Sequence, residues 1–238
     1  MKCEIYALGR AGKALRLSLE RIKKQPDILF LTVPDDQIAQ VASKLATQEK
    51  LPRIIAHLSG ANSYKILEVL ENKAAIAQFH PLAALTGLEA IPKNSLCAIS
   101  AKQPWAEQIL LDLAQNIGLI PVSLRPDKAT EYHAAAVLTG NLTLGLVLQS
   151  LKLMQEAGID PEKSRLGLSK LLHSVADNIA QQDILKALSG PVARRDFETI
   201  QKHLAILSPE VGEIYRTLSS WLQPITAPDP LSLKTGLS

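Results

Sequence analysis

The sequence predicts an α/β protein in which a shortened, mainly parallel sheet is followed by an all-helical domain. Two observations support this prediction. As far as Leu124, short apolar runs alternate with amphipathic stretches, which is the pattern of a parallel sheet covered by helices on both faces. Beyond Lys128 no segment resembles a strand, and the apolar residues recur at helical spacing. We therefore expect domains at residues 1–125 and 126–223, followed by a tail at 224–238.

The expected elements follow one another at short intervals. Strands are predicted at Cys3–Leu8, Ile28–Val33, Arg53–His57, Ala75–Phe79, Leu96–Ser100 and Ile120–Leu124. Helices between these strands are predicted at Lys13–Lys24, Gln37–Ala46, Ser63–Asn72 and Trp105–Ile117. The second half is predicted to hold the helices Ala129–Ala157, Pro161–Gln181, Asp196–Leu207 and Pro209–Leu222.

Composition narrows the possible functions. Nearly half of the 238 residues are apolar, enough for one large core or two modest ones. A net charge of +3 is small, and only 4% of the residues are aromatic, so we expect no nucleic-acid partner. Two cysteines cannot form a disulfide framework and the N-terminus lacks signal-peptide features, which predicts a cytoplasmic protein. His, Cys and carboxylate groups lack metal-ligand spacing, so no metal is expected.

An uncharged stretch in the second half, Ala134–Leu151, is about long enough to cross a bilayer. Polar residues such as Thr139, Asn141 and Gln149 interrupt it, so we expect a buried helix and no membrane insertion. The stretch is apolar around most of its circumference. A homodimer is the simplest way to bury such a helix.

The first strand leads into Ala7-Leu8-Gly9-Arg10-Ala11-Gly12, at the place where a nucleotide-binding strand turns into its helix. That pattern uses three glycines, for a tight turn, for close approach to a pyrophosphate and for helix packing, and Ala7 replaces the first. The acidic residue that usually holds a ribose 2′-hydroxyl ends a strand about twenty residues later. Here the chain runs directly into the strand at Ile28, so the adenosine half of such a site is expected to be absent.

Four further segments place polar groups at the ends of apolar runs, where ligands bind to parallel sheets. They are His57-Leu-Ser-Gly-Ala61, Phe79-His-Pro-Leu82, Tyr132-His-Ala-Ala-Ala-Val-Leu-Thr-Gly-Asn141 and Leu188-Ser-Gly-Pro-Val-Ala-Arg-Arg-Asp196. Together with Val33-Pro-Asp-Asp36, their combination and order resemble a family of Rossmann-like proteins whose helical C-terminal part is domain of unknown function 2520. The resemblance extends to about Tyr215.

That family is similar, at a distance, to pyrroline-carboxylate reductases, prephenate dehydrogenases and ketopantoate reductases. These enzymes pair an NAD(P) domain with a helical domain of the 6-phosphogluconate-dehydrogenase-like type, which often dimerises. The resemblance implies an oxidoreductase that transfers a hydride between NAD or NADP and a small anionic carbonyl or imine compound. A ketopantoate-reductase-like activity is one form of this hypothesis.

The resemblance also assigns residues to the cofactor. Gly9, Arg10 and Gly12 would face the phosphates, Val33 and Pro34 would lie beside the nicotinamide ribose, and Ser59 would border the ring. His80 lies in a His-Pro-Leu sequence that resembles the His-Pro turn of prephenate dehydrogenases.

Polar residues of the second half are the further candidates. His133 and Asn141 are eight residues apart on the expected long helix, roughly 80° apart around its axis, so both can face one cleft. His133 is the candidate proton donor, since an imidazole titrates near neutral pH, and Asn141 would orient the substrate carbonyl. Arg194 and Arg195 precede an expected helix cap and would clamp a substrate carboxylate.

Each assignment has a structural alternative. His57 and His80 can hold turns, His133 can be a core histidine, and Asn141 can bond between helices. The arginine pair can form ion pairs with Asp196 or Glu198. Asp35 and Asp36 are better explained as a turn and helix cap than as catalytic carboxylates.

The shortened N-terminal half departs from the family pattern, because a strand, a helix and a short strand are missing before Val33. Right-handed crossovers would then favour the opposite face of the sheet for the first helix. Either this helix relocates or a partner chain completes the sheet. The loss also supports a second hypothesis, a degenerate, non-catalytic member that binds a small anion or serves in dimerisation.

Overall fold

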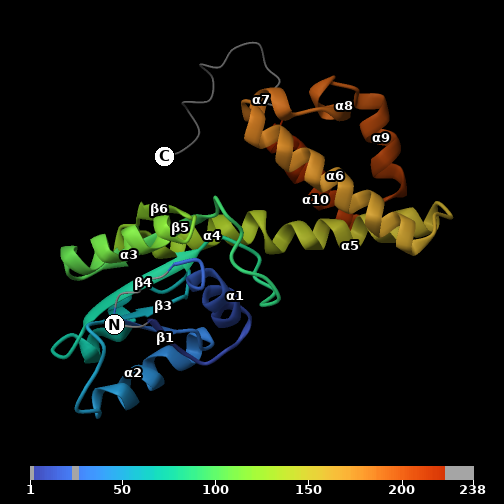
Figure 1. The fold of residues 1–238 in the computed structure, drawn as a ribbon. Coiled ribbons are helices and arrows are strands. Elements are labelled where there is room, and N and C mark those ends of the chain that lie inside the picture. Colours follow the sequence, from blue (N-terminus) through green and yellow to red (C-terminus); the bar gives the residue numbers. More distant parts are fainter. Residues whose placement is uncertain (1–2, 23–26, 223–238) are drawn as a thin grey trace, which may run out of the picture. The chain divides into compact units, whose positions relative to one another are not determined.

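The computed structural model describes residues 3–22 and 27–222, which form two compact units (Figure 1). The first unit ends at Thr143 and contains a sheet, and the second begins at Leu144 and is helical. The boundary lies inside α5 (Asn141–Glu156), so α4 (Ala129–Thr139) belongs to the first unit. Tyr132 and His133, both on α4, therefore share a unit with the sheet.

The sheet has six strands in the order β1-β2-β3-β4-β5-β6. Strands β1 to β4 are parallel, β5 runs antiparallel to β4, and β6 is parallel to β5. Their bounds are β1 (Cys3–Tyr6), β2 (Ile28–Leu31), β3 (Ile54–His57), β4 (Ala75–Pro81), β5 (Leu96–Ala101) and β6 (Ile120–Ser123). The predicted mainly parallel sheet is confirmed, with a strand at each of the six expected places.

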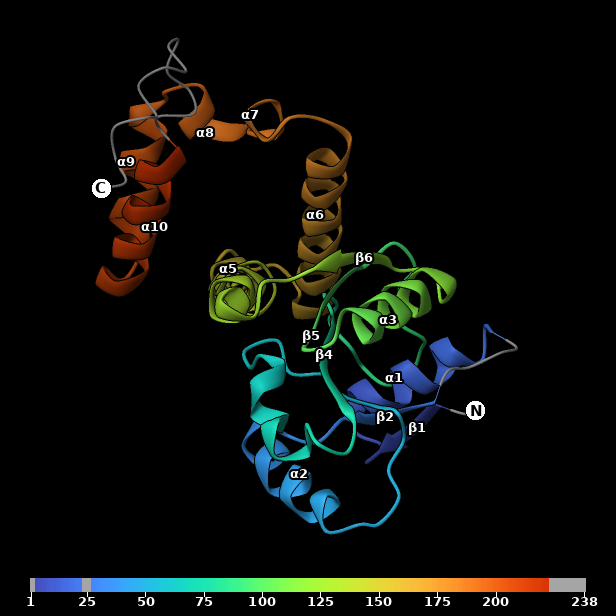
Figure 2. The ribbon, with the colours of Figure 1, turned by 90° about the vertical axis from the view of Figure 1, so that its left-hand side faces the viewer.

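Helices cover both faces of the sheet (Figure 2). α1 (Arg10–Leu19) and α3 (Pro104–Asn116) pack on one face, and α2 (Ile38–Ala46) and the 3₁₀ helix η2 (Tyr64–Leu70) pack on the other. Because successive strand residues point to opposite faces, Phe30 joins the first core and Leu31 the second. Phe30 and Phe79 meet edge to face in the first core, with ring centroids 5.4 Å apart.

Three predicted helices differ in detail. Ser63–Asn72 forms the 3₁₀ helix η2, and the amides of Lys73 and Ala74 both donate to the carbonyl of Leu70 to turn the chain into β4. The first helix ends at Leu19 instead of continuing to residue 24, and residues 23–26 lie outside the described part of the chain.

The predicted helix Ala129–Ala157 is divided at Gly140 into α4 and α5, since glycine is a poor helix former. The ladder continues across the break, because the amide of Gly140 donates to the carbonyl of Ala136 over 2.8 Å.

The crossover through α1 has an unusual hand. From β1 to β4 the chain steps in one direction across the sheet, yet α1 packs on the opposite face from α2 and η2. The β1-α1-β2 connection therefore has the opposite hand to the two that follow it. Of the two alternatives, relocation of α1 is wrong, because side chains at the end of α1 hold it on the face of α3. Ser18 Oγ accepts from the amide of Ile91 over 2.9 Å, and Arg21, just beyond the helix, donates to the carbonyl oxygens of Ile91 and Ile117 over 3.1 and 2.8 Å.

The second unit contains most of α5 and five further helices among the described residues. They are α6 (Pro161–Gln181), α7 (Ile184–Ala187), α8 (Gly190–Ala193), α9 (Phe197–Ile206) and α10 (Pro209–Leu222). Asp160 and Asp196 cap α6 and α9 by accepting from the amides of Lys163 and Thr199, each over 3.0 Å. The predicted tail at 224–238 lies outside the described residues.

The apolar helix of the second half is exposed within one chain. The run Pro126–Glu156 is long and apolar enough to cross a membrane by length and composition. None of its most apolar window is buried, so the expectation of a buried helix is wrong for the single chain. Its exposed leucines are Leu138, Leu142, Leu144, Leu146 and Leu148. The described residues of one chain leave this surface uncovered.

Candidate functional site

The turn after β1 keeps the shape of a phosphate-binding turn without its first glycine. Ala7 has a left-handed φ of 71°, which is the conformation that favours glycine. Gly9 is the N-cap of α1, and Arg10 is its exposed first residue. No acidic residue lies in the first turn of α1, whose leading amides have no partner within the helix. This end of α1 is therefore suited to an anion.

Gly12 is required by packing. A Cβ at this position would lie 2.5 Å from Thr32 Oγ1 and 2.7 Å from the carbonyl oxygen of Ala7. Thr32 in turn donates its hydroxyl to the Ala7 carbonyl over 2.5 Å. The third glycine of the pattern serves close helix packing. Gly12 has this role because a Cβ there would collide with Thr32, the residue that braces the turn.

The predicted ribose segment lies at the end of β2. Val33 is half-buried and Pro34 is exposed. Asp35 and Asp36 form a short 3₁₀ turn, but the carboxylate of Asp35 accepts from Ser59 Oγ over 2.7 Å instead of capping a helix. The expected turn is confirmed, and the expected cap is replaced by a contact with Ser59 in the loop after β3.

Ser59 is buried and lies at the centre of a polar network at the end of β3. Its hydroxyl accepts from the amide and the side chain of Asn62 over 3.1 and 3.0 Å. Gln78 donates to the Ser59 carbonyl over 2.9 Å, and its own carbonyl accepts from Ser100 Oγ over 3.1 Å. Gln78 was missed by the sequence analysis, although a glutamine inside an apolar strand is a signal of such a brace.

His57 is structural. It is fully buried, its Nδ1 accepts from the amide of Ser59, and its Nε2 lies 3.2 Å from the carbonyl oxygen of Ser63. Nε2 therefore carries the proton and donates to Ser63. Burial lowers the pKa of His57 to about 4, so the ring is neutral near pH 7. The alternative in which His57 holds a turn is the one that its contacts support.

His80 and His133 converge on Gly60. A Cβ added to Gly60 would lie 2.5 Å from His133 Nδ1 and 2.9 Å from His80 Nε2. The two imidazole rings are nearly perpendicular, with centroids 6.1 Å apart. His133 Nδ1 is buried and has no hydrogen-bond partner among the described residues. Two ring nitrogens thus face the one position in this loop where a side chain is absent.

Tyr132 approaches the other side of His80. Its hydroxyl oxygen lies 2.9 Å from His80 Nδ1, and the two rings meet edge to face. Burial, followed by the nearby His133, lowers the pKa of His80 to about 4. His80 is therefore neutral near pH 7. Tyr132 and Gly60 were not singled out from the sequence, because these contacts join segments that are far apart in the chain.

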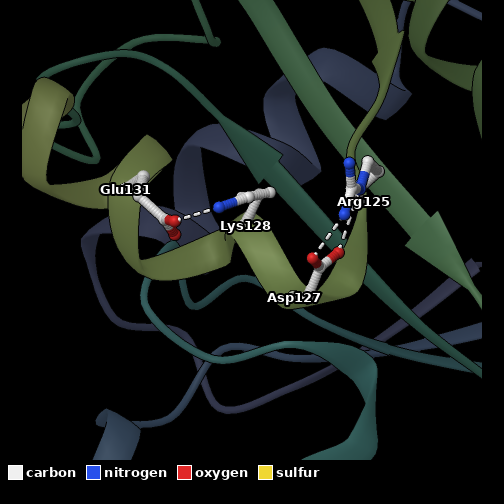
Figure 3. Close-up of polar contacts among 4 residues, drawn as sticks. All are labelled: Arg125, Asp127, Lys128 and Glu131. Atoms are coloured by element: carbon white, nitrogen blue, oxygen red, sulfur yellow. Dashed lines mark hydrogen bonds and ion pairs between the residues drawn. The ribbon is translucent and has the colours of Figure 1, made fainter. Parts of the chain in front are cut away.

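The start of α4, which carries Tyr132 and His133, is held at the surface by ion pairs (Figure 3). Arg125 donates twice to Asp127, over 3.1 and 2.6 Å, and Lys128 pairs with Glu131 at 2.5 Å. These groups are exposed, so each pair adds little stability. Asp127 and Glu131 also place negative charge at the N-terminal end of α4, where the helix dipole favours it.

The remaining predicted residues are not brought into this cluster. Asn141 is exposed at the start of α5, and it has no hydrogen bond to either histidine among the described residues. Gly140 separates α4 from α5, but its backbone stays in the α-helical region and the ladder continues, so the helical spacing of His133 and Asn141 is kept. Arg194 and Arg195 are exposed in the second unit and precede Asp196, which caps α9 as expected.

The residues present fit one half of a dinucleotide. The first turn of α1, Val33 and Ser59 border the same end of the sheet as the histidine pair. β1 is the edge strand among the described residues, so no further strand carries an acidic group to an adenosine ribose. The residues that the resemblance assigns to the phosphates and the nicotinamide lie at this end of the sheet, and the expected absence of the adenosine side agrees with the edge position of β1 among the described residues.

Comparison with known proteins identifies the family. Residues 95–221, more than half of the chain, match the Domain of unknown function (DUF2520). The chain belongs to the DUF2520 family. Residues 7–83 match a Rossmann-like domain, so the resemblance predicted from the motifs of this DUF2520 protein is confirmed. Among curated proteins none matches the chain.

Solved structures of similar fold cover nearly the whole DUF2520 chain. Protein TM1727 from Thermotoga maritima is 21% identical, with a TM-score of 0.75 over 94% of this chain and 98% of that one. BF3122 from Bacteroides fragilis, provisionally classed as an NADP oxidoreductase, is 15% identical, with a TM-score of 0.74 over 93% and 97%. A 1-pyrroline-5-carboxylate reductase from Streptococcus pyogenes is 12% identical, with a TM-score of 0.63 over 94% and 98%. These similarities establish the fold, a Rossmann-like sheet followed by a helical part.

Proposed function

We propose that this DUF2520 protein is an oxidoreductase that transfers a hydride between a nicotinamide nucleotide, NAD or NADP, and a small anionic carbonyl or imine compound. The observation that carries the proposal is the convergence of His80 Nε2 and His133 Nδ1 on the bare Cα of Gly60. Carbonyl reduction needs a hydrogen-bond donor at the oxygen and a proton source beside it. Two histidine nitrogens that converge on one backbone position can supply both groups.

The site divides into a binding side and a reacting side. The first turn of α1 and Val33-Pro34 would hold the phosphate and ribose of the nucleotide, with Ser59 at the nicotinamide. A bound nicotinamide would supply or accept the hydride. His80 orients the substrate oxygen, and His133 gives or takes the proton. Gly60 lets the two rings approach the backbone this closely, because a Cβ there would lie within 3.0 Å of atoms of both rings.

Arg194 and Arg195 remain the candidates for the substrate carboxylate. Both are exposed, and they adjoin the N-terminus of α9, which adds amide donors for an anion. Asn141 remains a candidate for orienting the substrate. Replacement of Arg194 by alanine should raise KM for anionic substrates more than it lowers kcat, whereas a surface control, Arg216→Ala, should change neither.

A second candidate function is favoured by the open edge of β1. A chain that has lost the adenosine side of its site can retain the fold and bind a small anion without catalysis, or serve only in dimerisation. Only the oxidoreductase would consume NADPH together with a substrate. Incubation with NADPH and a panel of 2-oxo acids and imines, followed by nicotinamide fluorescence, should show oxidation that His133→Gln abolishes. If no substrate is consumed and the same anions still bind, the non-catalytic function is supported.

We also infer that the protein is a cytoplasmic homodimer joined through the helical unit. Only Leu168 and Ile200 are buried among the large hydrophobic side chains described in that unit, while five leucines of the α4–α5 run are exposed. A second copy of the chain would cover this apolar surface symmetrically. Light scattering after gel filtration should give twice 25.8 kDa, and Leu144→Gln with Leu148→Gln should give the monomer. A monomeric wild type that binds lipid vesicles would support a membrane instead.

A further inference from the structure

The contact between Tyr132 and His80 constrains where the ring proton of His80 lies. The Tyr132 hydroxyl has one proton and two nearby acceptors on the same residue. His80 Nδ1 is 2.9 Å from the hydroxyl oxygen, and the His80 backbone carbonyl oxygen is 3.4 Å away. The tautomer of the imidazole depends on which of these two atoms accepts the hydrogen bond from the hydroxyl, because an accepting Nδ1 cannot also carry the ring proton.

The distances favour the ring nitrogen. Hydroxyl-to-oxygen hydrogen bonds are usually about 2.5–3.0 Å long, so the carbonyl contact at 3.4 Å is weak. Burial also raises the pKa of Tyr132, which keeps its hydroxyl protonated and able to donate. If the Tyr132 hydroxyl donates a hydrogen bond to Nδ1, this nitrogen is the acceptor and is unprotonated. A neutral His80 must then carry its ring proton on Nε2.

We propose that Tyr132 is a positioning residue that holds the ring proton of His80 on Nε2, so that His80 offers a hydrogen-bond donor above Gly60. This inference rests on the proposed function for the identity of the acceptor, the substrate oxygen. His80 Nε2 lies on the Gly60 side of the ring, opposite the nitrogen that Tyr132 contacts. Tyr132 itself reaches no reacting group and acts through His80.

This tautomer separates the roles of the two histidines. When a carbonyl is reduced, negative charge develops on its oxygen, and a fixed donor at that oxygen stabilises the charge. A neutral imidazole held as an Nε2 donor polarises the carbonyl without giving up its proton. The proton that completes the alcohol then comes from His133, whose Nδ1 has no competing partner among the described residues. His80 without Tyr132 could exchange between both tautomers, and the donor would be present only part of the time.

The chain contains a matched control pair. His203 Nδ1 lies 2.9 Å from the hydroxyl oxygen of Tyr215 in the second unit, and these rings also meet edge to face. Tyr215→Phe removes the same contact away from the site. Tyr132→Phe and Tyr215→Phe therefore differ in which histidine loses its hydroxyl partner.

The test is the ¹⁵N chemical shifts of the histidine ring nitrogens in the full-length protein near pH 7, without cofactor or substrate. In the wild type, His80 Nε2 should show the shift of a protonated nitrogen and Nδ1 that of an unprotonated one. Tyr132→Phe should move both His80 shifts toward an averaged value, and Tyr215→Phe should leave them unchanged. His80→Gln assigns the signals.

A wild-type His80 with its proton on Nδ1, or with averaged shifts, overturns the inference even if Tyr132→Phe does not fold. Unchanged His80 shifts in a folded Tyr132→Phe protein overturn it as well. The measurement needs no nucleotide, so it can fail while NADPH still binds and is oxidised. Conversely, the tautomer can be correct in a protein that does not bind NADPH, which would reject the proposed function alone.

Discussion

The hydroxyl of Thr32 donates to the carbonyl of Ala7, an alanine held in the left-handed region with φ of 71°. This contact braces the turn between β1 and α1, where the nucleotide-binding pattern has its first glycine. The turn therefore keeps its shape through a side chain from β2's C-terminal end, although the residue at its centre is strained. Alanine in place of the first glycine therefore lowers the stability of the protein more than it changes the backbone geometry of the turn.

Replacing Ala7 by glycine should stabilise the protein. Relief of the left-handed strain outweighs the extra entropy of glycine in the unfolded chain, so the free energy of unfolding should rise by about 0.5–1 kcal/mol. Urea denaturation measures the change. Ala11→Gly is the control, because it introduces glycine into α1 at a position without positive φ and should destabilise by a similar amount. Equal destabilisation by both variants would contradict the account of the turn.

A side chain at Gly60 should displace the two histidines. The added Cβ of Gly60→Ala would lie within 3.0 Å of atoms of both His80 and His133, so the two rings must separate. Turnover should fall by roughly 10- to 100-fold once a substrate is known, because small misplacements of reacting groups reduce rates steeply. Gly145→Ala is the matched control, since nothing lies within 4 Å of a Cβ there. Gly60→Ala with unchanged kinetics would remove the histidine pair from the reaction.

Acid should destabilise the protein through His57. The pKa of its fully buried ring is lowered to about 4, whereas the unfolded chain has a histidine pKa near 6.5. Between these values the unfolded chain binds a proton that the folded chain excludes, so stability is complete above about pH 6.5 and is lost as the pH falls toward 4. The loss should be on the order of 2–3 kcal/mol.

The measurement is urea denaturation of the wild type at several pH values across this window. His57→Gln should reduce the dependence to the part that His80 contributes, since the pKa of His80 is also lowered to about 4. His173→Gln, at an exposed histidine, should leave it as in the wild type. A wild type whose free energy of unfolding is constant across the window would show that His57 is protonated in the folded state.

The absence of a strand beyond β1 in the described residues should reduce the contribution of the adenosine to nucleotide affinity. Because β1 is the sheet edge in the described residues, the adenosine of NADH has no strand to contact beyond it. NADH and reduced nicotinamide mononucleotide should therefore bind with dissociation constants within about tenfold of each other, a difference of about 1.4 kcal/mol. Competition calorimetry provides the comparison. If NADH binds far more tightly than the mononucleotide, another part of the protein, or a partner chain, supplies the adenosine contacts.

Local sequence patterns predicted the positions of the strands and helices better than they predicted how these elements pack against one another. The alternation of apolar runs located the strands, and the position of Pro161 and Pro209 located two helix starts. Periodicity does not specify which face a helix covers, so the opposite-handed crossover through α1 was not foreseen. Contacts made by Ser18 and Arg21 decide that placement.

The site shows the same division. His80 and His133 were found from their motifs, because polar groups at strand and helix ends are visible in a sequence. The contact of His80 with Tyr132 spans 52 residues and depends on the packing of α4 against β4. Asn141 was predicted from helical spacing, which does not specify whether a side chain reaches a partner, and it is exposed at the start of α5. Buried Gln78 was the signal that could have revealed the brace behind Ser59.

The central claim, that a nicotinamide nucleotide binds beside the histidine pair, is tested most directly by titrating the purified protein with NADPH and NADH. Nicotinamide fluorescence and heat of binding should be followed together. Saturable binding of one nucleotide per chain is expected at roughly micromolar to millimolar concentration, and it should be weaker in Gly60→Ala. No change in fluorescence or heat at millimolar nucleotide would contradict it and would leave the non-catalytic function as the better explanation of the fold.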